Sequence, residues 1–335
     1  MTIKDISAQT GYSVGTVSRV LNNQPNVSEK ARKAIWEAAD QCGFQLNANA
    51  KQLKQSHSNA VLVVVKGTSN ELFSGLVETI QACIADTPYQ LIVDYIDESS
   101  NEVLRAVQLC RERKPLGILF LGGNREHFLA DFRRIQVPAV LMTNDACGLG
   151  FDNLSSVSSD DTLAATTVID HLIDDGHRRI VVIGGDIQTS DTSRLRYEGC
   201  MVAFTGHDLA RFDPLQDYES VRFSFEDGYR GAKNLLARGR KFTALFAMSD
   251  VMAIGAIRAL RDEGLRVPED VSVIGFDGLA IGAYTVPRLS TVRQNVDAMA
   301  RRSVEMLLEN IKSSRPPRYE TVPFTMVIRE SSQEN

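Results

Sequence analysis

The chain has 335 residues, of which 24% are charged and 43% are hydrophobic, and its formal net charge is −5. This length predicts two or three domains with sizeable apolar cores, and the composition excludes a disordered chain, a collagen-like fibre and a small disulfide-dependent scaffold. The net charge hides an asymmetry. Residues 1–59 contain seven Lys or Arg and four Asp or Glu, whereas residues 60–335 contain 30 Lys or Arg and 38 Asp or Glu. A basic segment of +3 joined to an acidic segment of −8 indicates two separate roles.

Three short helices are predicted in residues 1–45. Thr2, Ser13 and Ser28 each precede a stretch with apolar residues at helical spacing, so each is expected to cap the helix that follows. Gly11 can adopt the positive φ of a tight turn between the first two helices. Two helices joined by a short glycine-containing turn, with a third helix in support, form the arrangement of a helix-turn-helix domain.

The second of these helices, expected from Val14 to about Asn22, presents a polar face. A helix whose N-terminal end enters the major groove of DNA can contact base edges and phosphates with such side chains, and an arginine suits guanine O6 and N7. The residues expected on this face are Gly15, Thr16, Ser18, Arg19 and Asn22. The alternative interpretation is a small helical domain whose polar face is only solvated.

Residues 46–59 are predicted to form a linker. The stretch 45–54 contains helix-forming residues but little apolar face, and it is too short to form a stable isolated helix in water. Such a segment can become ordered when it binds a partner. The alternative is a plain polar linker with one incidental leucine, Leu53.

Residues 60–335 alternate strand-like runs with helical stretches. Strands are expected at 60–65, 91–95, 117–121, 139–142, 180–183, 244–247 and 271–274, and helices at 72–84, 102–113, 126–135, 162–175, 196–204, 228–237 and 251–263. Repeated βα units predict parallel sheets with helices on both faces. Because the units are too many for one sheet, we expect an α/β core of two doubly wound parallel-sheet lobes. Ligands of such folds bind at the carboxyl ends of strands and between lobes.

No catalytic or metal-binding motif stands out in this core. It has no GxGxxG after the first strand, no phosphate-binding loop that ends in GK[ST], and no GxSxG. His171 and His177 are spaced wrongly for two metal ligands on one helix face, and the five cysteines are far apart in the sequence. We therefore expect a protein that is not an enzyme, with no catalytic residue, no metal and no cofactor.

The sequence also favours a cytoplasmic location. The chain begins Met-Thr-Ile-Lys-Asp with no apolar signal region behind it, and the apolar run Ala60–Val65 is far shorter than the roughly 18 residues that a membrane span needs. We expect no membrane partner.

Several stretches of the sequence resemble the lac repressor/purine repressor (LacI/GalR) family of bacterial regulators. In the head they are Thr2-Ile3-Lys4-Asp5-Ile6 and Thr16-Val17-Ser18-Arg19-Val20-Leu21-Asn22, followed by Val27-Ser28 and Gly43-Phe44. In the core they are 171–173 with 176–180, 249–256, 267–268, 270–277 and 289–294.

The resemblance implies an all-α helix-turn-helix DNA-binding domain at 1–45, a hinge helix at 46–59 and an effector-binding and dimerisation core at 60–335. The core is expected to have the fold of periplasmic sugar-binding proteins, with two lobes joined by three crossovers. The first lobe is expected at about 60–160 and 290–320, and the second at about 161–289 and 321–335.

The resemblance also implies DNA-contacting residues. Family members read the major groove with the second helix, and paired hinge helices lie in the minor groove, where a leucine opens a central base step. Leu53 matches that leucine, while Leu46 and Lys51 stand where the family usually has proline and arginine. The implied DNA contacts are Thr2, Ser13, Val14, Gly15, Thr16, Ser18, Arg19, Asn22, Ala50, Lys51 and Leu53.

Seven further residues match effector contacts of the family. Arg196 and Asp277 match the residues that hold polar effector groups, and Phe223 matches an aromatic residue that packs on the effector. Ser249 and Thr143 stand where sugar-binding members often have asparagine and aspartate, so the usual sugar-binding set is only partly present. The implied effector contacts are Leu72, Phe73, Thr143, Arg196, Phe223, Ser249 and Asp277.

The sequence therefore predicts a transcription regulator, with repression favoured, that binds near-palindromic double-stranded operator DNA as a homodimer. A small effector bound between the lobes, with a sugar or sugar derivative favoured, is expected to control it. Two alternatives remain open: a regulator of the same class that responds to a purine or another non-sugar metabolite, and a solute-binding protein or enzyme. In the cell, the regulator is expected to be associated with the nucleoid when it is bound to DNA.

Overall fold

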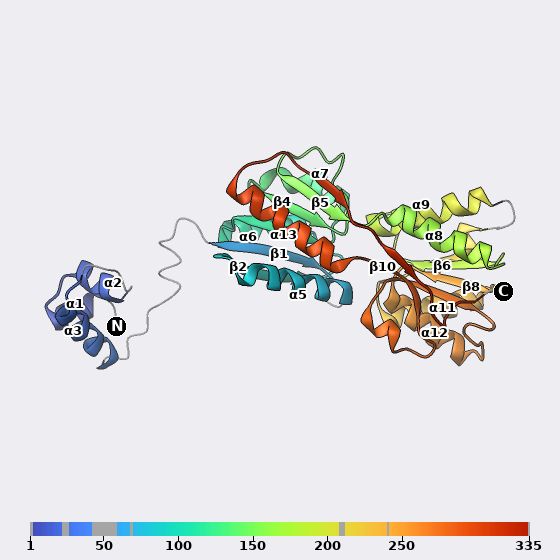
Figure 1. Cartoon of the computed structure of the whole chain (residues 1–335), viewed down its shortest axis with the longest axis horizontal. Coiled ribbons are helices and arrows are strands. Elements are labelled where there is room, and N and C mark those ends of the chain that lie inside the picture. Colours follow the sequence, from blue (N-terminus) through green and yellow to red (C-terminus); the bar gives the residue numbers. More distant parts are fainter. Residues whose placement is uncertain are drawn as a thin grey trace. The chain divides into compact units, whose positions relative to one another are not determined.

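The computed structural model describes residues 3–21, 27–41, 59–67, 70–207, 212–239 and 241–333. The chain divides into two compact units, one that ends at Ser58 and one that begins at Asn59 (Figure 1). The predicted hinge up to residue 58 lies outside the described residues, as do five of the implied DNA contacts: Thr2, Asn22, Ala50, Lys51 and Leu53. None of the helices in the described ranges has the length and apolar composition that a bilayer span requires.

The first unit contains the three predicted helices, α1 (Ile3–Thr10), α2 (Val14–Leu21) and α3 (Glu29–Gln41). Two predicted caps are confirmed, because Ser13 Oγ accepts a hydrogen bond from Thr16 N at 3.2 Å and Ser28 Oγ accepts one from Ala31 N at 3.3 Å. Gly11 has a φ of 72° in the turn between α1 and α2, as predicted. The helices enclose a small core that contains Ile6, Val17, Val20, Leu21, Ile35, Ala38 and Ala39.

The second unit begins with a lobe built on a six-stranded parallel sheet of order β11-β5-β4-β3-β1-β2. Its strands are β1 (Ala60–Lys66), β2 (Gln90–Ile96), β3 (Gly117–Leu121), β4 (Ala139–Met142), β5 (Leu154–Ser158) and β11 (Tyr319–Thr321). One face packs on α5 (Glu71–Ala85) and α13 (Val296–Lys312), and the other on α6 (Glu102–Arg113), α7 (Arg125–Asp131) and the 3₁₀ helix η1 (Phe132–Arg134).

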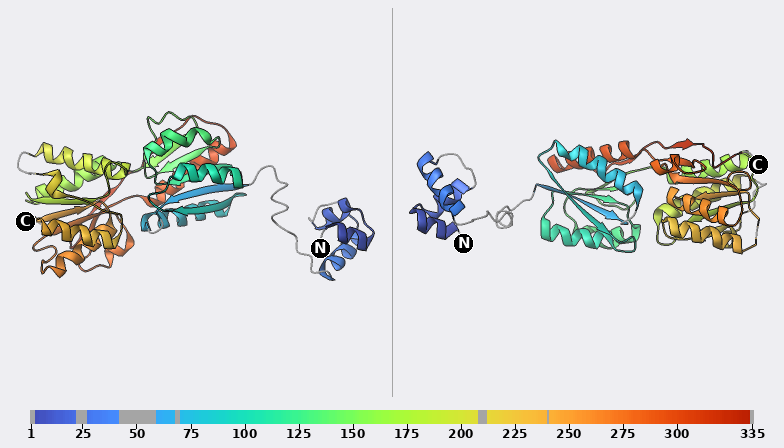
Figure 2. Two further views of the ribbon diagram at one scale, coloured as in Figure 1. Left: turned by 180° about the vertical axis from the view of Figure 1, so that it is seen from behind. Right: turned by 90° about the horizontal axis from the view of Figure 1, so that it is seen from below.

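The second lobe contains another six-stranded sheet, of order β12-β10-β9-β8-β6-β7, in which β12 alone runs antiparallel to its neighbour. Its strands are β6 (Ile180–Gly184), β7 (Tyr218–Ser220), β8 (Ala244–Ala247), β9 (Ser272–Asp277), β10 (Ser290–Arg293) and β12 (Thr325–Val327). Its helices are α8 (Asp161–Asp174), α9 (Asp191–Gly206), α10 (Pro214–Asp217), α11 (Phe225–Ala237), α12 (Asp250–Asp262) and the 3₁₀ helix η2 (Ala280–Ala283). The helix pair α8–α9 covers one face and the pair α11–α12 the other (Figure 2).

The chain passes between the lobes after β5, after β10 and after β11. The expected assignment of residues 290–320 to the first lobe is wrong at its start. Ser290–Arg293 form β10, which pairs with β9 in the second sheet, and the chain enters the first lobe only at α13. The element boundaries expected from periodicity otherwise agree with the structure to within a few residues over β1–β4, α6, α8 and β8.

Periodicity did not predict β5 or α13. The sequence of β5 is Leu-Ser-Ser-Val-Ser, which has no apolar run although every residue is buried. Two of its serines have hydrogen-bond partners in other segments, because Ser156 Oγ donates to Asp145 Oδ1 at 2.9 Å and Ser155 Oγ accepts from Arg318 N at 3.1 Å. A buried polar strand of this kind depends on partners that are distant in the sequence.

Candidate functional site

The helix α2 presents an exposed face opposite its buried one. Val17 and Val20 are buried in the core of the first unit, whereas Val14, Gly15 and Arg19 are exposed. Thr16 and Ser18 are half-buried at the border of this face. Ser13 Oγ lies 3.0 Å from Thr16 Oγ1, so these two hydroxyl groups form one polar patch at the N-terminal end of the helix. The described residues implied as base and phosphate contacts therefore lie on one side of one helix.

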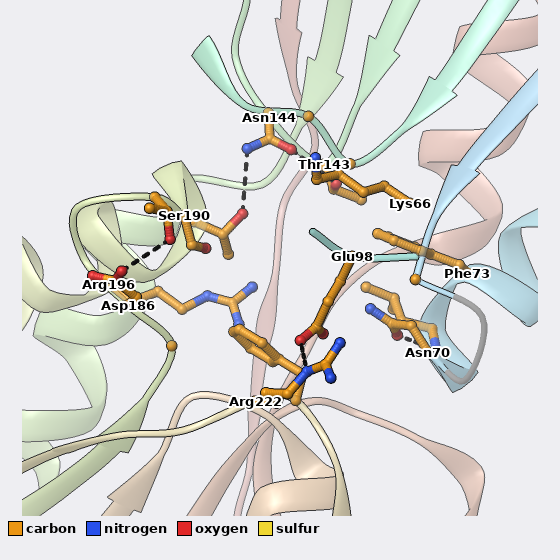
Figure 3. Close-up of a pocket in the computed structure, with 18 of the residues that line it drawn as sticks. Lys66, Asn70, Phe73, Glu98, Thr143, Asn144, Asp186, Ser190, Arg196 and Arg222 are labelled. Atoms are coloured by element: carbon orange, nitrogen blue, oxygen red, sulfur yellow. Dashed lines mark hydrogen bonds and ion pairs between the residues drawn. The ribbon is translucent and has the colours of Figure 1, made fainter. Parts of the chain in front are cut away.

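The second unit contains a cavity of about 490 Å³ where the carboxyl ends of the strands of the two sheets meet (Figure 3). Such a volume is typical of sites for small molecules. The first lobe contributes Lys66, Gly67, Asn70, Leu72, Phe73, Glu98, Ser99, Gly122, Gly123, Thr143 and Asn144. The second lobe contributes Gly185, Asp186, Thr189, Ser190, Thr192, Arg196, Ser220, Val221, Arg222, Phe223, Arg230, Asp277 and Gln294.

Arg196, on α9, is the most constrained cation in this cavity. Its Nε donates to Asp161 Oδ1 at 2.8 Å, and its Nη1 donates to the carbonyl oxygen of Met248. The guanidinium carbon lies 3.5 Å from the ring centroid of Phe276, and Nη2 lies 3.9 Å from Asp277 Oδ1. Three sides of the guanidinium are thus occupied by protein, and Nη2 is the nitrogen that a ligand in the cavity can share with Asp277.

Asp277 ends β9 at the floor of the cavity with an unusual backbone, since its φ is 114°. Its Oδ1 accepts a hydrogen bond from Gln294 Nε2 at 2.8 Å, and Gln294 Oε1 in turn accepts one from Ser159 Oγ at 3.1 Å. Burial raises the pKa of the Asp277 carboxyl to about 6, and the guanidinium of Arg196 opposes this effect. Thr143, which also lines the cavity, has a φ of 70°. Strained residues of this kind gather at ligand sites.

Phe73 and Phe223 line the cavity from opposite lobes. Phe73 is buried against Gly122, where an added Cβ would lie 3.1 Å from the ring, and an added Cβ on Gly185 would lie 2.7 Å from the ring of Phe223. These two glycines therefore let the rings approach the backbone closely, and the cavity wall has one apolar surface on each side.

Ser249 does not line the cavity, although the resemblance places it among the effector contacts. It is buried, and its Oγ accepts a hydrogen bond from Met252 N at 3.3 Å as the N-terminal cap of α12. Its hydroxyl group therefore has a structural role in the cap of α12, and the side chain is not part of the cavity lining. The other six implied contacts, Leu72, Phe73, Thr143, Arg196, Phe223 and Asp277, line the cavity.

Several cavity residues were not predicted from the sequence. Lys66 is an example: its Nζ lies 2.5 Å from Oε2 of Glu102, a carboxylate with no exposed surface, and it also donates to the carbonyl oxygen of Ser100 at 2.7 Å. Asn70, Glu98, Asn144 and Asp186 follow strands or begin helices at the same edge. Their position directly after predicted strands was the available signal, because that edge is where ligands bind in parallel sheets.

Direct contacts join the two lobes around the cavity. At its mouth, Arg222 forms ion pairs with Asp97 and Glu98 (Figure 3). Asn144 Nδ2 donates to Thr192 Oγ1 at 3.3 Å within the cavity. Beside it, the backbone N–H of Arg125, at the start of α7, donates to Asp191 Oδ2 at 2.7 Å. These bonds are made only when the lobes are close together, so the cavity wall depends on the lobe arrangement.

The charged groups of the cavity are largely balanced by protein. Arg196 faces Asp161 and Asp277, Lys66 faces Glu102, and Arg222 faces Glu98. The hydroxyl, amide and carboxylate groups that remain suit a polar ligand without a strong net charge. Among the described residues, no group of three or more His, Cys, Asp or Glu side chains is placed to hold a metal ion.

Comparisons with known proteins match both units. A model described as "Bacterial regulatory proteins, lacI family" matches residues 2–47, and one described as "Periplasmic binding protein-like domain" matches residues 169–332. The HTH-type transcriptional regulator MalR of Clostridium butyricum is 32% identical over 334 residues, which cover 99% of each chain.

Two solved structures also match over nearly the whole chain. The transcriptional regulator CelR in complex with cellobiose has a TM-score of 0.72 at 26% identity, and the match covers 99% of this chain and 100% of that one. A lac repressor dimer bound to operator and an anti-inducer has a TM-score of 0.77 at 23% identity and 99% coverage of both chains, which shows the shared fold. The proteins matched are transcriptional regulators and not enzymes.

The raised pKa of Asp277 predicts a pH-dependent effect of its replacement. Because the folded state binds this proton more readily than the unfolded chain, ionised Asp277 opposes folding at neutral pH, and the penalty disappears as the pH falls through 6 towards 4. Asp277→Asn should therefore raise the free energy of unfolding by at most about 3 kcal/mol at about pH 7.5, which is measured as a higher midpoint of thermal unfolding, Tm. At about pH 4.5, the same replacement should raise Tm much less. A Tm difference that is equal at both pH values would contradict this account of the carboxyl.

Proposed function

The chain belongs to the lacI family of bacterial regulatory proteins and is a transcription regulator, and on this premise we propose that it is a repressor controlled by a small neutral effector. The observation that supports the proposal most is the presence, in one chain, of an exposed DNA-reading face on α2 and a polar cavity between two lobes. Neither feature alone would indicate a regulated DNA-binding protein.

In the proposed DNA complex, α2 lies in the major groove. Its buried residues hold it on α1 and α3, so the exposed face that includes Val14, Gly15 and Arg19 is free to approach base edges. The Arg19 guanidinium is suited to guanine, and the exposed Val14 side chain to the methyl group of thymine. Ser13 and Thr16, at the N-terminal end of the helix, are placed to contact phosphate.

We also infer that the repressor acts as a homodimer. The described segment from Ile281 to Val286 exposes three large apolar side chains, Ile281, Tyr284 and Val286, of which Tyr284 is 85% exposed. Contiguous exposed apolar residues are typical of protein interfaces. A lac repressor of the same fold has been solved as a dimer bound to operator. A two-fold dimer would read a near-palindromic operator.

The proposed effector is sugar-like. Its hydroxyl groups would donate to Asp277 and accept from Nη2 of Arg196, while Phe73 and Phe223 would pack on the apolar faces of a sugar ring. The balance of charges in the cavity disfavours a strongly anionic ligand such as a phosphorylated metabolite. Cellobiose is the ligand in the structure of the related CelR. Two aromatic rings on opposite lobes would also suit a flat purine, which is the second candidate.

Effector binding is proposed to act through the lobe arrangement. A ligand that contacts both Phe73 and Phe223 has different interactions when the lobes are close together and when they are apart, so it shifts the equilibrium between these states. The bonds that Arg222 and Asn144 make across the cavity would form in the state with the lobes close together and break in the other state. This proposal places the protein in the cytoplasm, where the operator and the metabolite are both accessible.

Replacement of Arg19 tests the DNA-reading helix. Arg19→Ala should weaken binding to the preferred operator by about 1–3 kcal/mol and relax the preference at one base pair of each half-site, as measured by selection from random duplex DNA. The control, Lys33→Ala, removes an exposed cation from α3 instead of α2 and should leave the selected sequence unchanged. Selection of the same sequence with equal affinity by Arg19→Ala would reject the assignment of α2.

Replacement of Arg196 tests the effector site. Arg196→Lys keeps a cation opposite the buried Asp161 but lacks Nη2. This variant should bind a stabilising sugar with an affinity at least about tenfold lower, because one hydrogen bond to a charged group is lost. The ligand is found by a thermal-shift screen of sugars and nucleobases, and stabilisation by a nucleobase alone would overturn the sugar assignment. Ser249→Ala, which removes only the cap of α12, is the control and should leave affinity unchanged. Unchanged affinity in Arg196→Lys would place the ligand elsewhere.

A further inference from the structure

One edge of the first lobe is basic, although the core as a whole is acidic. The strands β3, β4 and β11 are parallel, so the loops that precede them lie at the same edge of the sheet. These loops, each taken with the last helical residues before it, are the segments 111–116, 132–138 and 312–318, and together they are called the basic edge here. The loop before β2, 86–89, and the end of the loop before β5, 147–153, lie at this edge as well.

The charge of this edge is opposite to that of the unit. The five segments contain eight Lys or Arg and three Asp or Glu, whereas residues 60–335 as a whole contain 30 Lys or Arg and 38 Asp or Glu. All eight cations belong to the basic edge, and seven of them are exposed, with Arg318 half-buried. The acidic excess of the core therefore lies elsewhere on its surface.

Two of these cations, Arg113 and Arg133, are available to an external partner. Arg134 forms an ion pair with Asp131, and Arg315 and Arg318 share Glu309. In contrast, Arg113 and Arg133 are exposed and form no ion pair within the described part of the chain. A surface of exposed arginines without acidic partners is typical of contacts with phosphate.

The basic edge adjoins the point where the chain enters the core. The carbonyl oxygen of Asn59 accepts a hydrogen bond from Gln90 N, and that of Ala60 accepts one from Leu116 N, both at 2.8 Å, so the loop 111–116 is bonded to the first residue of β1. Figure 1 shows that α13, which precedes the loop 312–318, ends at the end of this lobe where β1 begins.

The basic edge is covalently linked to the unit that contains α2. Seventeen residues, 42–58, separate α3 from Asn59, so covalent geometry limits the span between them to at most about 60 Å. A tether of this length raises the effective concentration of DNA at the edge, so that contacts too weak to bind DNA alone still contribute.

We propose that the basic edge is a second, sequence-independent DNA contact that binds the phosphate backbone of the duplex held by the first unit. The proposal rests on the proposed function, because it requires DNA bound by α2. In the part of the chain that the structure describes, this surface consists of loops and helix ends, which suit phosphates more than base edges, so it would add affinity and salt dependence without altering the preferred sequence.

The test is a salt titration of binding to a fluorescent duplex of random sequence, with the full-length chain. Arg113→Glu combined with Arg133→Glu should weaken binding at low salt. The negative slope of log Kobs, the observed association constant, against log salt concentration should become less steep by about 1–2. The control combines Arg179→Glu with Lys241→Glu, two exposed cations in loops before β6 and β8 of the second lobe, and should retain the wild-type slope. The control changes the net charge by the same amount.

The outcomes are distinct. If the wild-type chain binds no duplex, the proposed function fails. If it binds, but the double variant of the basic edge keeps the wild-type slope and affinity, or the control loses as much, the inference is wrong. A lower Tm with an unchanged slope would show that these arginines only stabilise the ends of helices. Should the charge-reversed variant fail to fold, Arg113→Gln with Arg133→Gln repeats the measurement with about half the expected change in slope.

Discussion

The buried guanidinium of Arg196 is the interaction on which the cavity most depends. It joins α9 to Asp161 at the start of α8, to the end of β8 through the carbonyl oxygen of Met248, and to Asp277 at the end of β9. A cation with so little exposure is stable only when its partners are correctly placed, because an unpaired buried charge is very costly. The second lobe is therefore organised around one charge, and the group that holds the charge also faces the ligand.

The alternating βα pattern predicted the two lobes because apolar runs such as Ala60–Val65 form fully buried parallel strands. It did not predict β5, whose serines are buried with bonds to Asp145 and the segment before β11, because that pairing brings together residues far apart in the sequence.

The same limit applies to the site. Arg196 and Asp277 follow from resemblance to a family and line the cavity, but Ser249, which the same resemblance implied, caps α12 instead. The pairing of Lys66 with buried Glu102 depends on the end of β1 and the start of α6 meeting in space.

The uneven charge of the chain has a structural counterpart. The first unit presents an exposed arginine on a helix held in place by a small apolar core, and the acidic core unit has a basic segment of surface at the edge where the chain enters it. A net charge of −5 would suggest a protein that avoids nucleic acid. In the first lobe, the surface suited to phosphate lies at the amino ends of the strands, whereas the cavity lies at their carboxyl ends.

The central claim is that the cavity and the DNA-reading helix are thermodynamically coupled through the lobes. The most direct test is a linkage measurement: the affinity of the full-length chain for its selected operator is determined with and without the effector, and the affinity for the effector with and without that operator. The account predicts that the two ratios are equal and differ from one. An effector that binds in the cavity while both ratios remain equal to one would contradict it.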